Sequence, residues 1–285
     1  MSAEHSLTAK DVRVGYDGHD VVKGLDLAVP PGRVTMIVGP NACGKSTLLH
    51  TMARLLTPAS GSVLLDGESI HALPTRRVAS LLGLLPQSPA APDGITVNDL
   101  VGRGRYPHQG WFRRWTPEDD RAVAEALTAT DVLELADRPV DSLSGGQRQR
   151  VWIAMALAQR TDVLLLDEPT TYLDVSHQLD VLDLLTDLNR DRGTTVVAVL
   201  HDLNLACRYA DHLVAMRDGR IVTEGSPTEV VTGELVSEVF AMRCTVVDDP
   251  ASGTPMIVPI GRHRCAPVVE AAASLPRNSS DKARS

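Results

Sequence analysis

The 285-residue chain lacks the features that would mark a membrane-spanning, secreted or disulfide-bonded protein. Its apolar runs, such as 163–166 and 194–200, are strand-sized and fall short of the about 20 residues that a membrane span needs. The first residues, MSAEHSLTAKD, show no basic start followed by an apolar core, so we expect no secretory signal. The four cysteines lack zinc-ligand spacing and indicate a reduced, cytosolic protein (Cys43, Cys207, Cys244, Cys265).

Aromatic residues are scarce, at 3% of the chain, and basic residues do not dominate. The net charge of −8 argues against broad binding to nucleic acid, so we expect no nucleic-acid partner. Positive charge gathers only near the end, in a stretch rich in Ala, Ser and Pro. We expect residues 265–285 to form a disordered tail and residues 242–264 to form a short extension before it.

Strand-like and helix-like segments alternate along the chain, which predicts α/β layering. Segments 12–14 and 21–29 flank Asp17-Gly18 and predict a hairpin, and a second hairpin is expected around 217–219. The other expected strands are 33–38, 62–66, 82–85, 163–167 and 194–200. The expected helices are 45–56, 96–101, 118–130, 144–159, 176–189 and 202–210. The chain shows no repeats, so we expect one unit over 5–241, with a helical subdomain inserted at about 88–160.

A glycine-rich loop follows the buried strand 33–38 and leads into a helix. Glycines let successive backbone N–H groups point inward, and the following helix adds its positive dipole end, so such a loop binds phosphate. Lys45 can reach the β- and γ-phosphates of a nucleotide, and the Ser46 hydroxyl can ligate Mg²⁺. The sequence therefore predicts an ATP site with Mg²⁺ on this loop (Gly39, Pro40, Asn41, Ala42, Cys43, Gly44, Lys45, Ser46, Thr47).

Two acids end the apolar strand 163–167 and the residue after it. Ligands of α/β folds sit at the carboxyl ends of the strands, so both carboxylates should face the nucleotide. We expect Asp167 to hold Mg²⁺ through water and Glu168 to orient or deprotonate the attacking water.

A second anion-binding pattern, Ser144-Gly145-Gly146-Gln147, stands about a hundred residues after the loop. Serine is a good helix N-cap, and the two glycines leave backbone N–H groups open to an anion. A chain with its own phosphate loop has little need for a second bare anion site. We therefore expect this segment to complete the ATP site of a second copy.

Taken together, these motifs resemble those of the ATP-binding cassette (ABC) ATPases, the motor subunits of ABC transporters, over about residues 7–240. The resemblance implies a P-loop core with a mostly parallel sheet, an N-terminal antiparallel β subdomain and the inserted helical subdomain. It implies that Tyr16 stacks on adenine and that Gln87 links the Mg²⁺ and γ-phosphate site to the helical subdomain. It also implies that Asp174 lies at a dimer seam and that His201 contacts the γ-phosphate, which makes Lys45, Glu168 and His201 the expected catalytic residues.

In that family two subunits sandwich two ATP molecules and bind membrane permeases, which receive cargo from a substrate-binding protein. The resemblance therefore implies a homodimer at the cytoplasmic face of the membrane, docked to a permease through a surface near 87–114. Three aromatic residues lie there and serve either partner contact or internal packing (Trp111, Phe112, Trp115). The segments 39–47, 102–108, 151–159 and 170–174 most resemble importers of iron–siderophore complexes. Haem and cobalamin importers are similar and stay open as alternatives.

Two positions depart from the family pattern, and two other classes of protein stay in competition. Ala42 stands where the family usually has Gly, and Tyr172 stands where many members have a small residue. A positive φ at Ala42 would cost about 1 kcal/mol. A soluble ABC ATPase acting on nucleic acid or ribosomes usually has two cassettes or a long coiled-coil insertion, and this chain has neither. A small-molecule kinase would need an acceptor site and a lid within the chain.

Overall fold

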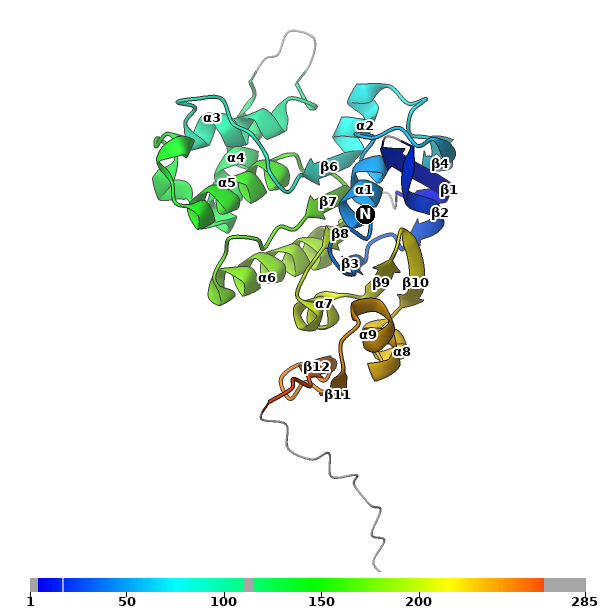
Figure 1. Cartoon of the computed structure of the whole chain (residues 1–285). Helices are drawn as coiled ribbons and strands as arrows, with labels where there is room; N and C mark the ends of the chain where they lie inside the picture. The colour runs from blue at the N-terminus through cyan, green and yellow to red at the C-terminus, as the bar shows by residue number, and fades with distance from the viewer. Residues whose placement is uncertain (1–4, 17, 110–114, 264–285) are drawn as a thin grey trace, which may run out of the picture.

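The computed structural model describes residues 5–16, 18–109 and 115–263 (Figure 1). Trp111, Phe112 and the expected tail at 265–285 lie outside these ranges. The centre of the molecule is a six-stranded sheet in the order β10-β9-β3-β8-β7-β6. Neighbouring strands from β9 to β6 run parallel, and β10 is antiparallel to β9. The strands are β3 (Val34–Val38), β6 (Leu82–Leu85), β7 (Val163–Asp167), β8 (Thr195–Val199), β9 (His212–Arg217) and β10 (Arg220–Gly225).

The three central strands β3, β7 and β8 are buried at every residue. Layers cover both faces of this sheet, which is why these strands carry apolar residues at most successive positions and do not alternate between apolar and polar residues. The expected α/β class and the expected strands at 33–38, 82–85, 163–167 and 194–200 are confirmed, with ends that shift by no more than one residue.

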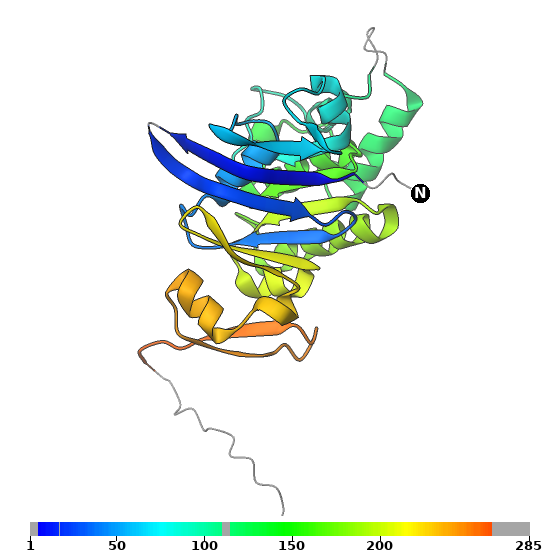
Figure 2. The same ribbon diagram turned by 90° about the vertical axis from the view of Figure 1, so that its right-hand side faces the viewer.

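A second, four-stranded sheet in the order β2-β1-β4-β5 covers one side of the core (Figure 2). Its strands are β1 (Leu7–Tyr16), β2 (His19–Val29), β4 (Ser60–Leu65) and β5 (Glu68–Ser69). β1 and β2 pair antiparallel from Leu7↔Val29 to Tyr16↔His19, so the expected N-terminal hairpin is confirmed. Helix α1 (Lys45–Met52) packs between the two sheets, where Leu48 and Leu49 are fully buried.

Helix α1 is shorter than the sequence pattern predicted. It ends at Met52 and not at Leu56, because Arg54 takes a left-handed conformation (φ 63°) that an α-helix cannot include. The amide N–H groups of Leu55 and Leu56 fold back onto the carbonyl of His50. The short helix α2 (Thr75–Leu81), which the sequence analysis missed, follows and leads into β6.

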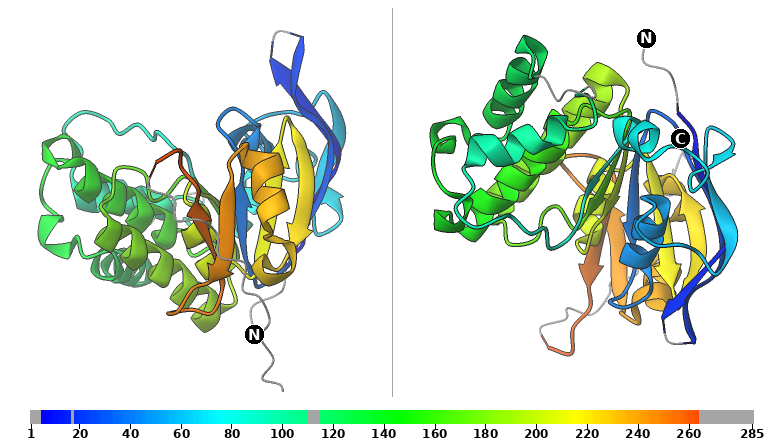
Figure 3. Two further views of the ribbon diagram at one scale, coloured as in Figure 1. Left: turned by 60° about the horizontal axis from the view of Figure 1, so that its bottom comes forward. Right: turned by 90° about the horizontal axis from the view of Figure 1, so that it is seen from above.

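Three helices and three short 3₁₀ turns form a helical group beside the sheets (Figure 3). They are α3 (Val97–Gly102), η1 (Arg103–Arg105), α4 (Pro117–Ala129), η2 (Leu133–Leu135), η3 (Val140–Ser142) and α5 (Gly145–Ala158). α5 packs against both α3 and α4 and carries the buried side chains Val151, Trp152 and Ile153. The helices expected at 96–101, 118–130 and 144–159 are confirmed to within one residue at each end.

A buried ion pair, Arg105–Asp119, connects three parts of this helical group. The Arg105 guanidinium donates to Asp119 Oδ1 (2.8 Å) and to the carbonyl of Ala158 (2.8 Å), joining η1, the start of α4 and the end of α5. Both side chains of the pair are 5% exposed. Burial alone would raise the pKa of Asp119. The hydrogen bonds from Arg105 and Thr116 together lower it by more, so the pKa of Asp119 lies below the ordinary 3.8.

We predict that Asp119→Asn lowers the free energy of unfolding by about 3 kcal/mol, because it leaves the Arg105 charge buried without a counter-ion. The pKa of Asp119 is depressed in the folded state, so its stabilisation is complete above the unfolded value of 3.8. That stabilisation is lost as the pH falls through the folded pKa, which lies below 3.8. Urea unfolding at pH 7 measures the loss. Glu68→Gln, which removes the exposed pair with Arg77, is the control; an equal loss in both variants would contradict the role of the buried pair.

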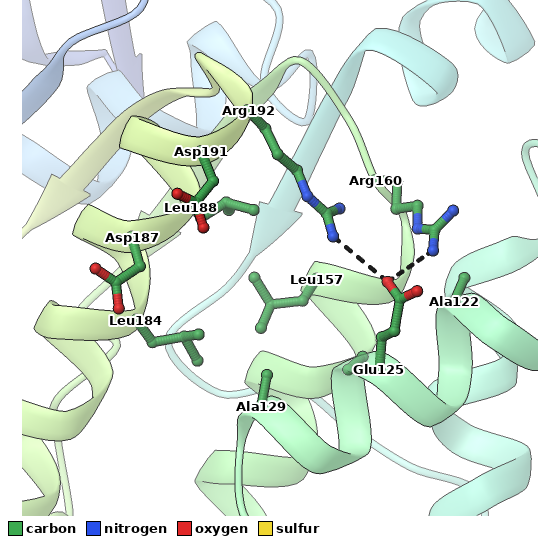
Figure 4. Close-up of a pocket in the computed structure, with 11 residues that line it drawn as sticks. Ala122, Glu125, Ala129, Leu157, Arg160, Leu184, Asp187, Leu188, Asp191 and Arg192 are labelled. Carbon is green, nitrogen blue, oxygen red and sulfur yellow. Dashed lines mark hydrogen bonds and ion pairs between the residues drawn. The ribbon is translucent and has the colours of Figure 1, made fainter.

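Helix α6 (Val175–Arg192) lies across a groove of about 240 Å³ from α4 and α5 (Figure 4). The groove has an apolar lining that includes Leu157, Leu184 and Leu188. Glu125 of α4 crosses it to Arg192 at the end of α6 (3.4 Å) and also pairs with Arg160 (2.7 Å). This groove is the seam between the helical group and the rest of the molecule.

The C-terminal part returns to the sheet side of the molecule through α7 (Leu203–Tyr209), α8 (Pro227–Val230) and α9 (Gly233–Phe240). A hairpin of β11 (Cys244–Asp248) and β12 (Pro255–Pro259), which the sequence analysis did not predict, then packs on α7. Asn204 exchanges hydrogen bonds with both backbone groups of Ile257, and Arg208 donates to Asp249 (2.5 and 3.1 Å). Among the described residues, no helix combines the length and the apolarity that a membrane span requires.

Candidate nucleotide site

The loop after β3 is shaped by glycines that no other residue could replace. Gly39 has φ 155°, and a Cβ on it would lie 2.2 Å from the carbonyl oxygen of Met216. Gly44 has φ 102° and occupies the N-cap of α1 without a side chain over the helix end. The loop therefore turns tightly and leaves the first N–H groups of α1 open to an anion.

Ala42 adopts φ 62°, so the positive φ considered from the sequence is present, and its cost of about 1 kcal/mol applies. Ala42 and Asn41 are exposed. Cys43 beside them is buried, and burial raises the pKa of its thiol, so Cys43 stays protonated and serves packing.

Lys45 is buried inside the loop that precedes it. Its Nζ donates to the carbonyl oxygens of Gly39 and Pro40, both at 2.8 Å. These two bonds position the ammonium group beside the cavity, where it can bind phosphate oxygens.

The next residue, Ser46, faces the end of β7. Its hydroxyl donates to Asp167 Oδ1 at 2.9 Å. The other oxygen of Asp167 is buried without a hydrogen-bond partner, although His50 Nε2 lies 3.2 Å away. A hydroxyl beside an unsatisfied buried carboxylate oxygen is the hard-oxygen donor set that Mg²⁺ prefers, so these residues fit the expected ion.

Side chains just past the ends of the neighbouring strands contact the Glu168 carboxylate. Gln87, just past β6, donates through Nε2 to Glu168 Oε2 (2.6 Å), and His201, just past β8, lies with Nε2 2.5 Å from Oε1. Thr171 Oγ1 adds a bond to Oε2 (3.2 Å). Glu168 itself has φ 53°, a strained conformation that points to a functional demand on its side chain.

The strand order explains why these residues meet. β3, β8, β7 and β6 are adjacent and parallel, so their carboxyl ends share one edge of the sheet. A cavity of about 460 Å³ opens at this edge and is lined by Val21, Asn41, Ala42, Gly44, Lys45, Ser46, Thr47, Gln87, Glu168 and His201. Sequence reasoning missed Thr171, because a threonine in a loop carries no signal until the fold brings it to Glu168.

Several expected site residues do not line this cavity: Tyr16, the segment 144–147, Asp174, Gly39, Pro40, Cys43 and Asp167. Tyr16 ends β1 with half of its surface exposed. Asp174 caps α6, accepting bonds from His177 and Ser176 that lower its pKa to about 2.

The segment 144–147 begins α5. Ser144 and Gln147 form a reciprocal capping box, in which the Ser144 hydroxyl accepts from the Gln147 N–H and Gln147 Oε1 accepts from the Ser144 N–H. Gly145 and Gly146 face Tyr172 and Leu173 and no residue of the chain's own cavity. Within one copy, the second anion-binding pattern is therefore separate from the first.

The phosphate loop, the Asp–Glu strand end and the shared strand edge define a P-loop nucleoside triphosphatase. The chain belongs to the ABC transporter family, whose model matches residues 22–171. The resemblance inferred from the sequence is thereby confirmed, and so are the expected fold class and the expected ATP-hydrolase activity.

Proteins of similar sequence or structure align with most of this chain. It is 55% identical over 256 residues to the ferric enterobactin transport ATP-binding protein FepC of Escherichia coli, covering 90% of this chain and 94% of that protein. It is 50% identical over 261 residues to the petrobactin import ATP-binding protein FpuD of Bacillus anthracis, covering 92% and 96%. The inward-facing structure of a metal-chelate type ABC transporter matches with a TM-score of 0.76 at 28% identity, covering 90% of this chain and 98% of that one.

A dimeric bacterial ABC transporter cassette, MJ0796, matches with a TM-score of 0.71 at 28% identity and covers 77% of this chain and 98% of that one. ABC cassettes thus assemble in pairs and work with membrane permeases. Pairing of cassettes is compatible with the finding that the segment 144–147 lies outside the cavity of its own chain.

Proposed function

We propose that this chain is the ATP-hydrolysing subunit of an importer for ferric siderophores. The observation that carries the proposal is that relatives at 50–55% identity, aligned over nearly their full length, are ATP-binding proteins for ferric enterobactin, achromobactin and petrobactin transport. Cobalamin import ATP-binding proteins of Halobacterium salinarum are 41% identical, and the alignment covers 63% of their length. Cobalamin import is therefore the second candidate, and haem import stays open from the sequence resemblance.

The phosphates of ATP are bound, in this proposal, by the loop 39–47, with Lys45 meeting the β- and γ-phosphates. Ser46, Asp167 and Gln87 would hold Mg²⁺, which would supply positive charge to offset that of the phosphates. Tyr16, which is half exposed at the end of β1, stacks on the adenine.

Glu168 receives a proton from the attacking water and orients that water toward the γ-phosphate. Gln87 and His201 occupy both oxygens of Glu168 in this structure. With ATP and Mg²⁺ bound, Gln87 would turn its amide oxygen to the ion and His201 would donate to the γ-phosphate, which would leave the Glu168 carboxylate free to accept from the water. Gln87 leads directly toward the helical group, so a movement of that group alters this contact.

The second half of each ATP site comes from another copy, whose Ser144, Gly145 and Gly146 close over the γ-phosphate, with Asp174 at the seam. The pair docks at the cytoplasmic face of the membrane on permease subunits, which receive cargo from a substrate-binding protein. The docking face lies near 87–114. Tyr106 within this range and Trp115 just after it are exposed, and the Trp115 indole donates to Asp120 (2.5 Å).

Uptake assays with labelled cargo test this proposal. In the source cell, deleting the gene should abolish uptake of a ferric siderophore, and the wild-type chain but not Glu168→Gln should restore it. Unchanged uptake of every ferric siderophore tried, with loss of cobalamin or haem uptake, would replace the first candidate by the second.

A further inference from the structure

Tyr172 is the most exposed large hydrophobic side chain in the described part of the protein, at 77%. It also has φ 67°, in the left-handed region that bulky residues avoid. Val175, three residues on, is 73% exposed. Within a single copy the tyrosine is thus strained and its ring lies largely in water, so the isolated fold offers no compensation.

The surroundings of Tyr172 identify the surface to which it belongs. Its Cβ lies 3.8 Å from the point where a Cβ on Gly145 would stand, and its carbonyl oxygen lies 3.8 Å from the same point on Gly146. Gly145 and Gly146 begin α5 and do not line the chain's own cavity. Tyr172 therefore extends the same surface that presents the segment 144–147.

This geometry limits what the ring can touch in a pair of copies. The inference rests on the proposed function: if Gly145 and Gly146 close over the partner's γ-phosphate, a long side chain beside them must reach the partner's phosphate loop. The exposed residues of that loop are Asn41 and Ala42. Ala42 is also the loop position that carries a methyl group at a positive φ.

We propose that the ring of Tyr172 packs on the Ala42 methyl of the second copy's phosphate loop when two copies close over ATP. Both residues hold left-handed conformations that cost stability in the single copy. Burial of the ring against the methyl group offsets this strain energy in the pair. The contact therefore stabilises the closed dimer and lengthens its lifetime.

The test measures ATP-dependent dimerisation of the purified chain in the Glu168→Gln background by analytical ultracentrifugation. Adding Tyr172→Ala should raise the dimer dissociation constant about tenfold, while ATP binding to the dilute monomer stays unchanged. Tyr172→Phe keeps the ring and should dimerise like the parent. Tyr106→Ala, which removes a comparably exposed aromatic from the helical group, should also dimerise like the parent.

A double-mutant cycle identifies the partner of the ring. Ala42→Gly should weaken the dimer when Tyr172 is present and change it much less in the Tyr172→Ala background. Equal dimerisation with and without Tyr172→Ala, or additive effects in the cycle, would overturn the contact and leave the proposed function standing. Failure of Glu168→Gln alone to form an ATP-dependent dimer would instead contradict the proposed function, and the contact with it.

Discussion

A Glu168→Gln variant is expected to bind ATP as tightly as the wild type and to hydrolyse it at least about a hundredfold more slowly. The amide has nearly the shape of the carboxylate, so the packing around it persists. It cannot accept a proton from water, and one of its two polar atoms becomes a donor facing the donors that Glu168 now satisfies. Phosphate release at saturating ATP measures the loss, and nucleotide titration measures the affinity.

Glu134→Gln is the matched control, because Glu134 is exposed on η2 of the helical group. It should keep the wild-type rate. If Glu168→Gln turned over ATP at a rate near that of this control, Glu168 would not be the proton acceptor.

Lys45→Ala and Ser144→Arg are each expected to abolish hydrolysis, but at different steps. Lys45→Ala removes the ammonium group that the loop holds in place, so ATP affinity should fall about a hundredfold. Ser144→Arg leaves the loop intact and places a bulky cation at the start of α5. ATP affinity of the monomer should therefore stay the same while ATP-dependent pairing is lost.

Circular dichroism of both variants provides the folding control, since Ser144 also caps α5. A Ser144→Arg variant that folds, binds ATP and hydrolyses it at the wild-type rate would contradict the role assigned to the segment 144–147.

Much of the fold could be predicted because its strongest signals are local. Strand β7 is a run of four apolar residues that ends in Asp167, β3 is apolar apart from Thr35, and α5 has both a capping box and a long apolar pattern. Residues 244–248 and 255–259 form a hairpin that sequence alone did not reveal. These strands are short, each is partly exposed, and their pairing depends on α7 through Asn204 and Arg208.

The candidate site divides in the same way. Gly39, Lys45 and Asp167 could be placed because a glycine turn and a strand end determine where they lie. Thr171 was missed, because its bond to Glu168 depends on the turn that follows β7, which the residue pattern does not specify. The left-handed conformation of Tyr172 was missed for a similar reason, since backbone strain leaves no trace in a residue pattern.

The central claim is that each ATP site is built from two copies, with the phosphate loop from one and the segment 144–147 from the other. Mixing purified Lys45→Ala and Ser144→Arg tests it directly, because each mixed pair joins one intact loop to one intact segment 144–147. The account predicts that the 1:1 mixture of these two inactive variants recovers ATP hydrolysis, to about a quarter of the wild-type rate when the two sites of a dimer turn over independently. A mixture as inactive as either variant alone, while wild-type chain at the same concentration hydrolyses ATP, would contradict it.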